Sequence, residues 1–152
     1  MLTLDYRLSP HKKSNLLGFD LSSVDEIALR YDLFLGDIIF QIDQCDLSAK
    51  WNWIPVVDFV AGLIAIGQSL NSGSQREVFE FTESDACLTF VKNEFGELLI
   101  SASYAACIAK LSLREFVEKV NDFAARFESE LTSAYPALLH NSHFKKCVSK
   151  IG

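Results

Sequence analysis

The sequence lacks an excess of positive charge. It holds 14 Lys and Arg against 20 Asp and Glu, which gives a net charge of −6 and a pI of about 5.0. Nucleic acids and anionic membrane surfaces are bound through basic patches. The charge balance therefore argues against both as direct partners. It is compatible with a basic protein partner, because complementary charge speeds encounter, and the alternative is that the mild acidity serves only solubility.

The short motifs that mark common catalytic and nucleotide-binding sites are also absent. The chain has no P-loop, no G-x-G-x-x-G and no G-x-S-x-G elbow. It has no apolar run of membrane-spanning length either, because the run over 54–70 is short and contains Asp58. We therefore expect no enzyme activity and no cofactor, and we interpret this run as a buried core helix.

The four cysteines form no C-x-x-C pair, and the first residues lack the basic and apolar regions of a secretion signal. Reduced thiols are then the default, and we expect a cytoplasmic protein. Cys87 and Cys107 lie in apolar runs and are expected to be small core residues. Burial would raise their pKa, so a Cys–His nucleophilic pair has no local support.

The 152 residues, of which 49% are hydrophobic, suit a single domain over 1–152. Alternation predicts a strand near Leu4 to Leu8, then a polar loop over 9–18. Apolar residues at every second position predict a strand over 27–35. Gly36 and Asp37 form a turn, and a strand over 38–43 would complete a hairpin. A connecting loop follows over 46–53.

The remaining pattern alternates helices and strands. Pro55 indicates the start of a helix that runs to Leu70. Strands over 78–82, 86–92 and 97–104 are too closely spaced for crossover helices, so they must form an antiparallel meander. Ser112 begins a capping box and a long amphipathic helix to about residue 133. A short final helix covers 137–148. The sequence thus predicts an α+β domain, with the central apolar helix and the long C-terminal helix on one face of the sheet.

Two charged features of this layout allow more than one interpretation. Glu77, Glu80, Glu83 and Asp85 fall within nine residues. They form a solvated strand edge, a partner-binding patch, or a site for a divalent cation or for acid–base chemistry. Asp58 stands alone in the apolar helix, so it must cap a backbone N–H, pair with a base such as Arg30, or face solvent.

His140, His143 and Cys147 are spaced to share one face of the final helix. All three side chains are zinc ligands, and His11 or Cys45 would supply a fourth. The alternative is an ordinary surface helix beside Lys145 and Lys146. We favour this alternative and expect no metal.

A small acidic domain with a β-meander and a long amphipathic C-terminal helix resembles the immunity proteins of bacterial contact-dependent growth inhibition and related polymorphic-toxin systems. The stretches 53–59 (WIPVVDF), 79–84 (FEFTES) and 96–104 (GELLISASY) are also similar to those of small bacterial domains. The resemblance covers most of the chain but includes no diagnostic motif, so no residue role is carried over. It implies a protein that binds one cognate toxin, often a nuclease with a basic cleft, and blocks it.

The candidate partner-binding residues are the acids of the hairpin and meander together with two tryptophans before the central helix. They are Asp32, Asp37, Asp43, Asp46, Trp51, Trp53, Glu77, Glu80, Glu83 and Asp85. Acidic groups would replace the nucleic-acid phosphates, and aromatic anchors would supply most of the affinity. The alternative is a non-catalytic regulatory or scaffolding domain that forms a homodimer through a sheet edge.

Overall fold

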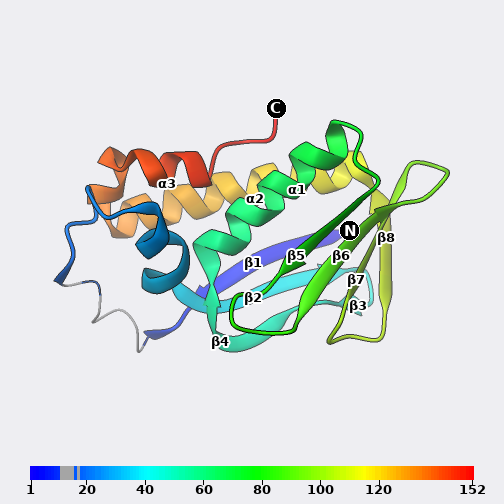
Figure 1. The fold of residues 1–152 in the computed structure, drawn as a ribbon, viewed down its shortest axis with the longest axis horizontal. Helices are drawn as coiled ribbons and strands as arrows, with labels where there is room; N and C mark the ends of the chain where they lie inside the picture. The colour runs from blue at the N-terminus through cyan, green and yellow to red at the C-terminus, as the bar shows by residue number, and fades with distance from the viewer. Residues whose placement is uncertain (11–15, 17) are drawn as a thin grey trace.

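A computed structural model of the chain describes residues 1–10, 16 and 18–152 (Figure 1). The predicted polar loop over 9–18 lies largely outside these residues. The elements in chain order are β1 (Leu2–Leu8), η2 (Ala28–Leu33), β2 (Leu35–Ile42), β3 (Cys45–Asp46), β4 (Ala49–Pro55), α1 (Val56–Asn71), β5 (Arg76–Glu80), β6 (Cys87–Lys92), β7 (Glu97–Ala102), β8 (Ile108–Ser112), α2 (Leu113–Ala134), η3 (Pro136–His140) and α3 (Ser142–Cys147).

The strands form two antiparallel sheets. In the first, β2 pairs with β1, β3 and β4, and in the second the order is β5-β6-β7-β8. The second sheet confirms the predicted meander and extends it by β8. Helix α1 packs against α2 and β5, and α2 packs against β1 and β8 (Figure 1). The predicted α+β class is therefore confirmed. No helix in the described part of the chain is long and apolar enough to cross a bilayer.

The long helix α2 begins and packs as its pattern predicts. Ser112 Oγ accepts the N–H of Glu115 at 3.0 Å, which satisfies one of the free donors of the first turn. The Glu115 carboxylate reaches across to β1 and accepts the N–H of Leu2 at 3.2 Å. Apolar residues at intervals of three and four are buried, and they are Phe116, Val120, Phe123, Phe127 and Leu131. This buried face holds α2 against the rest of the core.

The predicted strand over 27–35 is wrong, because Ala28–Leu33 form the π-helix η2. Leu29 and Leu33 are buried and are spaced at i and i+4, while Tyr31 between them is exposed. Residues at i and i+4 share a helix face, so alternating leucines satisfy a helix as well as a strand. The Asp25 carboxylate accepts the N–H of Ala28 at 2.9 Å at the start of this turn. The expected hairpin does not form, and β2 pairs with β1 instead.

The predicted loop over 46–53 is also wrong, because it contains β3 and β4. Gly36 pairs with Ile54 and Ile38 pairs with Ala49, so Asp37 alone lies opposite four residues of β4. This bulge interrupts the alternation by which a strand is recognised. A Cβ at Gly36 would lie 2.0 Å from the carbonyl oxygen of Arg7, so the close approach of β1 and β2 requires glycine.

The predicted final helix over 137–148 is divided at Asn141, which separates η3 from α3. Asn141 is 1% exposed. Its amide nitrogen donates to the carbonyls of Leu21 and Val24 at 2.9 and 3.0 Å. Its amide oxygen accepts the N–H groups of His143 and Phe144. One buried amide therefore caps α3 and ties it to a distant loop.

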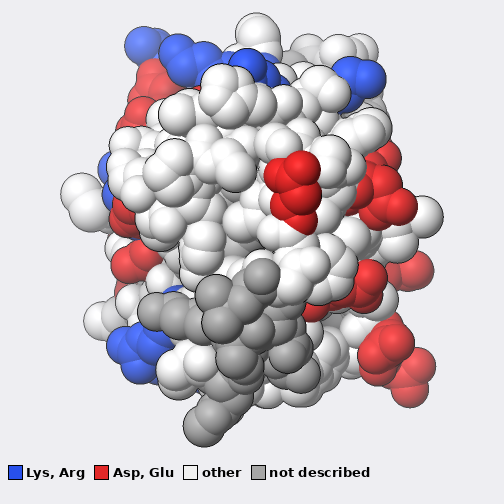
Figure 2. All heavy atoms as spheres, turned by 90° about the vertical axis from the view of Figure 1, so that its left-hand side faces the viewer, with Lys and Arg blue, Asp and Glu red and all other residues white. Residues whose placement is uncertain are grey.

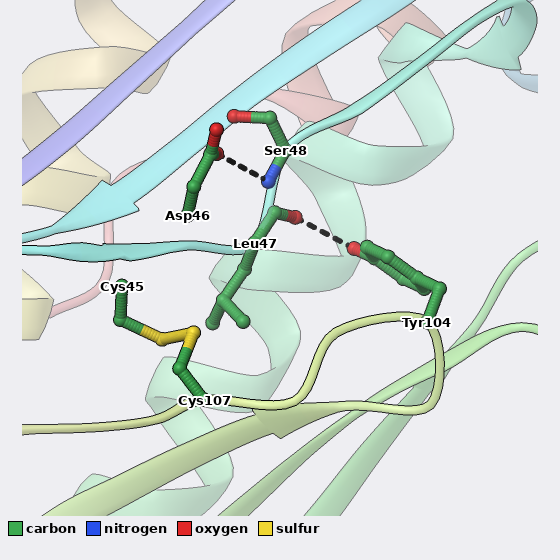
Figure 3. Close-up of a disulfide and its surroundings, with 6 residues drawn as sticks. All are labelled: Cys45, Asp46, Leu47, Ser48, Tyr104 and Cys107. Atoms are coloured by element: carbon green, nitrogen blue, oxygen red, sulfur yellow. Dashed lines mark hydrogen bonds between the residues drawn. A yellow bond between two sulfur atoms is a disulfide. The ribbon is translucent and has the colours of Figure 1, made fainter.

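A disulfide between Cys45 and Cys107 joins the two sheets (Figure 3). Nearby, the hydroxyl of Tyr104 donates to the carbonyl of Leu47 at 2.7 Å. The expectation that Cys107 is a reduced core thiol is therefore wrong. Cys87, the other expected core residue, is only half-buried. Together the disulfide and the hydrogen bond link the β3–β4 segment to the loop between β7 and β8.

Candidate functional site

A pocket of about 350 Å³ lies where η2, β4 and the β5–β6 turn meet. Its walls come from segments far apart in the sequence, and they are Tyr31, Asp32, Leu35, Trp53, Pro55, Thr82 and Glu83. Three of these, Asp32, Trp53 and Glu83, belong to the partner-binding residues that the sequence predicts. We call this surface the acidic–aromatic pocket.

The aromatic part of the pocket consists of Trp53 and Tyr31, whose exposed fractions are 39% and 37%. Trp53 stacks on Trp51, with ring centroids 5.5 Å apart and planes inclined by 25°. Trp51 in turn makes edge contacts with Phe81 and Tyr104 at 5.2 and 5.1 Å. Trp51 is therefore a packing residue, and it holds the more exposed Trp53 at the pocket wall.

The bulge in β4 sets the position of both tryptophans. Asn52 lies between them with φ of 67°, a left-handed conformation that Asn tolerates better than most residues. Its N–H donates to Oδ1 of Asp37 at 2.8 Å. Trp51 and Trp53 are two positions apart and their rings stack on one side of the strand. Asp37, predicted to bind a partner, has a structural role here because it supports the bulge.

The acidic part of the pocket consists of Asp32 and Glu83, which are both exposed. Asp32 lies in the last turn of η2. Glu83 has φ of 60° in the turn closed by the N–H of Phe81, which donates to the carbonyl of Ala86 at 3.0 Å. Within the described residues, neither carboxylate forms an ion pair or a hydrogen bond. Both carboxylates can therefore accept hydrogen bonds from a ligand.

Among the described residues, the pocket walls contain no Lys, Arg or His. The neighbouring base, Arg30, is paired with Asp58: its Nε and Nη2 donate to Oδ1 at 2.9 and 2.6 Å, and its guanidinium carbon lies 5.8 Å from the ring centroid of Tyr31. This pair confirms one of the three predicted roles of Asp58 and ties η2 to α1. Figure 2 shows the left-hand side of Figure 1, where acidic side chains gather along the right of the view, basic ones lie along its upper edge, and both kinds alternate along its left edge.

Two predicted acids have local partners outside the pocket. Hydrogen bonds from Ser48, its side chain first and its backbone N–H second, lower the pKa of Asp46 below its usual range. Asp43 lies in the β2–β3 turn and pairs with the N-terminal ammonium of Met1. Asp43 also lines a second pocket, of about 380 Å³, beside the disulfide. Its described lining contains Lys110 and no aromatic residue. It therefore suits a cationic ligand less well than the acidic–aromatic pocket does.

The acids between Glu77 and Asp85 do not form one cluster. Glu77 accepts the hydroxyl hydrogen of Ser74 at 2.6 Å. Strand β5 ends at Glu80, so Glu83 and Asp85 lie in the following turn and the predicted strand alternation does not reach them. Glu80 and Asp85 are exposed and do not line the acidic–aromatic pocket. No group of three His, Cys, Asp or Glu among the described residues could hold a metal ion.

The predicted helix face of His140, His143 and Cys147 is wrong because the helix breaks at Asn141. Both histidines are exposed, whereas Cys147 is buried. Burial raises the pKa of the Cys147 thiol, which opposes the thiolate that a nucleophile requires. Cys45 is committed to the disulfide, and His11 lies outside the described residues.

Sequence reasoning missed Tyr31, Leu35, Pro55 and Thr82 as members of the pocket. The alternating pattern predicts that Tyr31 lies in a strand over 27–35, but this segment forms η2. The other three residues carry no chemical signal of their own. Only the tertiary contacts bring these residues beside Trp53.

A comparison of the chain with protein-family models, with curated proteins and with solved structures found no match.

Proposed function

We propose that the chain is a binding protein that neutralises a basic partner by covering its active surface, as an immunity protein does to its cognate toxin. The single observation that carries this proposal is the acidic–aromatic pocket. Two part-exposed aromatic rings and two carboxylates border one cavity. Aromatic anchors in pockets supply much of the energy of protein interfaces, and carboxylates attract basic partners.

The charge distribution supports the same proposal. Residues 1–100 carry 15 acidic and 7 basic side chains, and residues 101–152 carry 5 and 7. The pocket belongs to the first, acidic part. A toxin that cleaves nucleic acid needs a basic cleft to bind phosphates, and an acidic protein surface competes for that cleft. Such occlusion needs no catalytic group in the inhibitor.

Co-expression tests this proposal directly. The protein encoded immediately upstream is produced in a bacterial host with and without this chain. We expect growth to stop without the chain and to resume with it. A double variant, Asp32→Asn with Glu83→Gln, should restore growth less well, whereas Asp85→Asn in the same turn should behave as the wild type. A harmless neighbour, or one that stays toxic beside the wild-type chain, would contradict the proposal.

A second candidate function is self-association through a sheet edge, and Ile108 favours it. Ile108 is 68% exposed on β8, the last strand of its sheet. The edge of β1 is closed by comparison, because Glu115 accepts the N–H of Leu2 and Arg126 donates to the carbonyl of Leu4 at 2.6 Å. Light scattering should then report a dimer that Ile108→Lys converts to a monomer. A wild-type monomer at high concentration would exclude this candidate.

A further inference from the structure

We propose that the acidic–aromatic pocket receives an arginine side chain of the partner protein. The guanidinium would lie against the rings of Trp53 and Tyr31 and donate to the carboxylates of Asp32 and Glu83. This inference rests on the proposed function, because it names the chemistry by which the same site would recognise a basic partner.

The size of the pocket suits one side chain. Its volume is about 350 Å³. Sites for small molecules span roughly 300 to 1,000 Å³, so this pocket lies at the small end of the range. An extended cofactor would overfill it. The guanidinium and alkyl stem of a single arginine are better matched to this space.

The charge of the pocket selects a cation. Its two carboxylates are those of Asp32 and Glu83, and none of the described residues in its walls is a base. Arg30 lies beside the pocket, 5.8 Å from the ring centroid of Tyr31, but its charge is paired with Asp58, which accepts from Nε and Nη2. An anionic ligand would meet two like charges with no counter-charge from the walls.

The aromatic walls favour arginine over lysine. A guanidinium is planar and weakly hydrated, so it stacks on aromatic faces and keeps its donors free at its rim. Those donors form a fork that matches carboxylate oxygens. An ammonium group is compact and strongly hydrated, and it cannot stack. In a site with both rings and carboxylates, arginine can therefore stack on the rings and donate to the carboxylates at once, whereas lysine can only donate.

The three walls are held in place before any ligand arrives. The Arg30–Asp58 pair ties η2, and hence Tyr31 and Asp32, to α1. Trp53 rests on Trp51. The β5–β6 turn is anchored through Phe81, which is 2% exposed and contacts the ring of Trp51. Little ordering is then needed on binding, which raises the affinity that a small ligand can reach.

Nuclear magnetic resonance of the full chain tests the inference, because the two tryptophans give two indole N–H signals. The probe is N-acetyl-arginine amide, and its matched control is the citrulline analogue, which has nearly the same shape but no charge. We expect the arginine probe to produce a saturable shift of the Trp53 indole signal. The dissociation constant of the citrulline analogue should be at least about tenfold higher. Equal shifts with citrulline or with N-acetyl-lysine amide, or no saturable shift, would overturn the inference.

Variants assign the binding to this pocket. Asp32→Asn and Glu83→Gln keep the size of each side chain and remove its charge. Each should weaken arginine binding several-fold, and the double variant should abolish it within the range tested. Asp85→Asn and Glu80→Gln remove nearby charges outside the pocket and should leave binding unchanged. If the control variants weaken binding as much as the pocket variants, the effect is one of net charge and the inference fails.

The two proposals fail in different ways. If the probe binds but the upstream protein is not neutralised, arginine recognition stands and the toxin-inhibitor function fails. If neutralisation succeeds while the probe produces no saturable shift, the function stands and arginine recognition is wrong.

Discussion

Two donors of Arg30, Nε and Nη2, meet the same carboxylate oxygen, Oδ1 of Asp58, at 2.9 and 2.6 Å. Asp58 is 7% exposed and lies in an otherwise apolar helix. A buried carboxylate without a partner would be costly, so Arg30 explains why an acid can occupy this position. The pair also fixes the orientation of η2, whose next two residues, Tyr31 and Asp32, line the acidic–aromatic pocket.

Asp58→Ala should lower the free energy of unfolding by about 2 to 3 kcal/mol, because it leaves the partly buried Arg30 without its charged hydrogen-bond acceptor. Urea denaturation at neutral pH measures the change. The matched control is Glu26→Ala, since Glu26 lies 3.9 Å from Arg30 and is half-exposed. That variant should cost no more than about 0.5 kcal/mol. Equal losses in the two variants would show that the Arg30–Asp58 pair stabilises the fold no more than the longer Arg30–Glu26 contact does.

The Cys45–Cys107 disulfide should add roughly 2 to 4 kcal/mol to stability, since it closes a long loop in the unfolded chain. The two cysteines are 62 positions apart. Denaturation with and without a thiol reductant should reveal the difference, and Cys45→Ser with Cys107→Ser should remove the response. Cys87→Ser should retain it. If the reductant leaves the free energy of unfolding of the wild type unchanged, this expectation is wrong.

The same disulfide ties stability to the compartment. Disulfides persist in oxidising environments and are reduced in the cytosol of most organisms. In a reducing cytoplasm the Tyr104–Leu47 hydrogen bond, the aromatic contacts of Trp51 and the shared hydrophobic core would have to hold the two sheets together without the disulfide. Stability measured on the reduced chain is therefore the relevant value for a cytoplasmic role.

Local patterns were sufficient to predict α1, α2 and the strands β5 to β7. Helix α2 and the strands have a clear period, α1 is a long apolar run, and both helices have a recognisable beginning, Pro55 for α1 and Ser112 for α2. The error at η2 has a physical cause. Leu29 and Leu33 fit both periods, and the choice depends on packing against α1, which no short segment reveals.

The candidate site was predicted in part. Asp32, Trp53 and Glu83 were named for their chemistry, but the bulge that presents Trp53 arises from the register between β2 and β4. The disulfide could not be deduced either, because Cys45 and Cys107 carry no spacing that indicates their pairing. Asp37 has a role that its chemistry alone does not reveal: its carboxylate, predicted to bind a partner, accepts a backbone N–H within the fold.

Tyr104 should make the chain sensitive to alkali. Burial, and then the charge of Asp46, raises the pKa of its phenol above the usual value. A raised pKa means that its stabilising effect is complete below about pH 10, the pKa of an unfolded tyrosine, and is lost as the pH rises further. Tyr104→Phe should cost about 1 kcal/mol at pH 7, from the lost hydrogen bond to Leu47.

The difference between the wild type and Tyr104→Phe should therefore stay constant up to about pH 10 and shrink as the pH rises to about 12. Urea denaturation across this range measures it. Both proteins should carry Cys87→Ser, so that exchange of this half-buried thiol with the disulfide does not contribute. Tyr6, whose pKa is also raised chiefly by burial, is common to both proteins and cancels in the comparison. A difference that stays constant with pH would show that the Tyr104 phenol titrates normally.

Asn52 tests whether the bulge itself positions the pocket. Its φ of 67° is open to glycine at no steric cost and is unfavourable for alanine by roughly 1 kcal/mol. Asn52→Gly should therefore leave stability nearly unchanged, whereas Asn52→Ala should lower it by about that amount. Both substitutions keep the backbone N–H that donates to Asp37. If the left-handed turn is what presents Trp53, the glycine variant should bind N-acetyl-arginine amide as the wild type does. The alanine variant should bind it more weakly, and equal binding and stability in the two variants would mean that the bulge tolerates a different backbone.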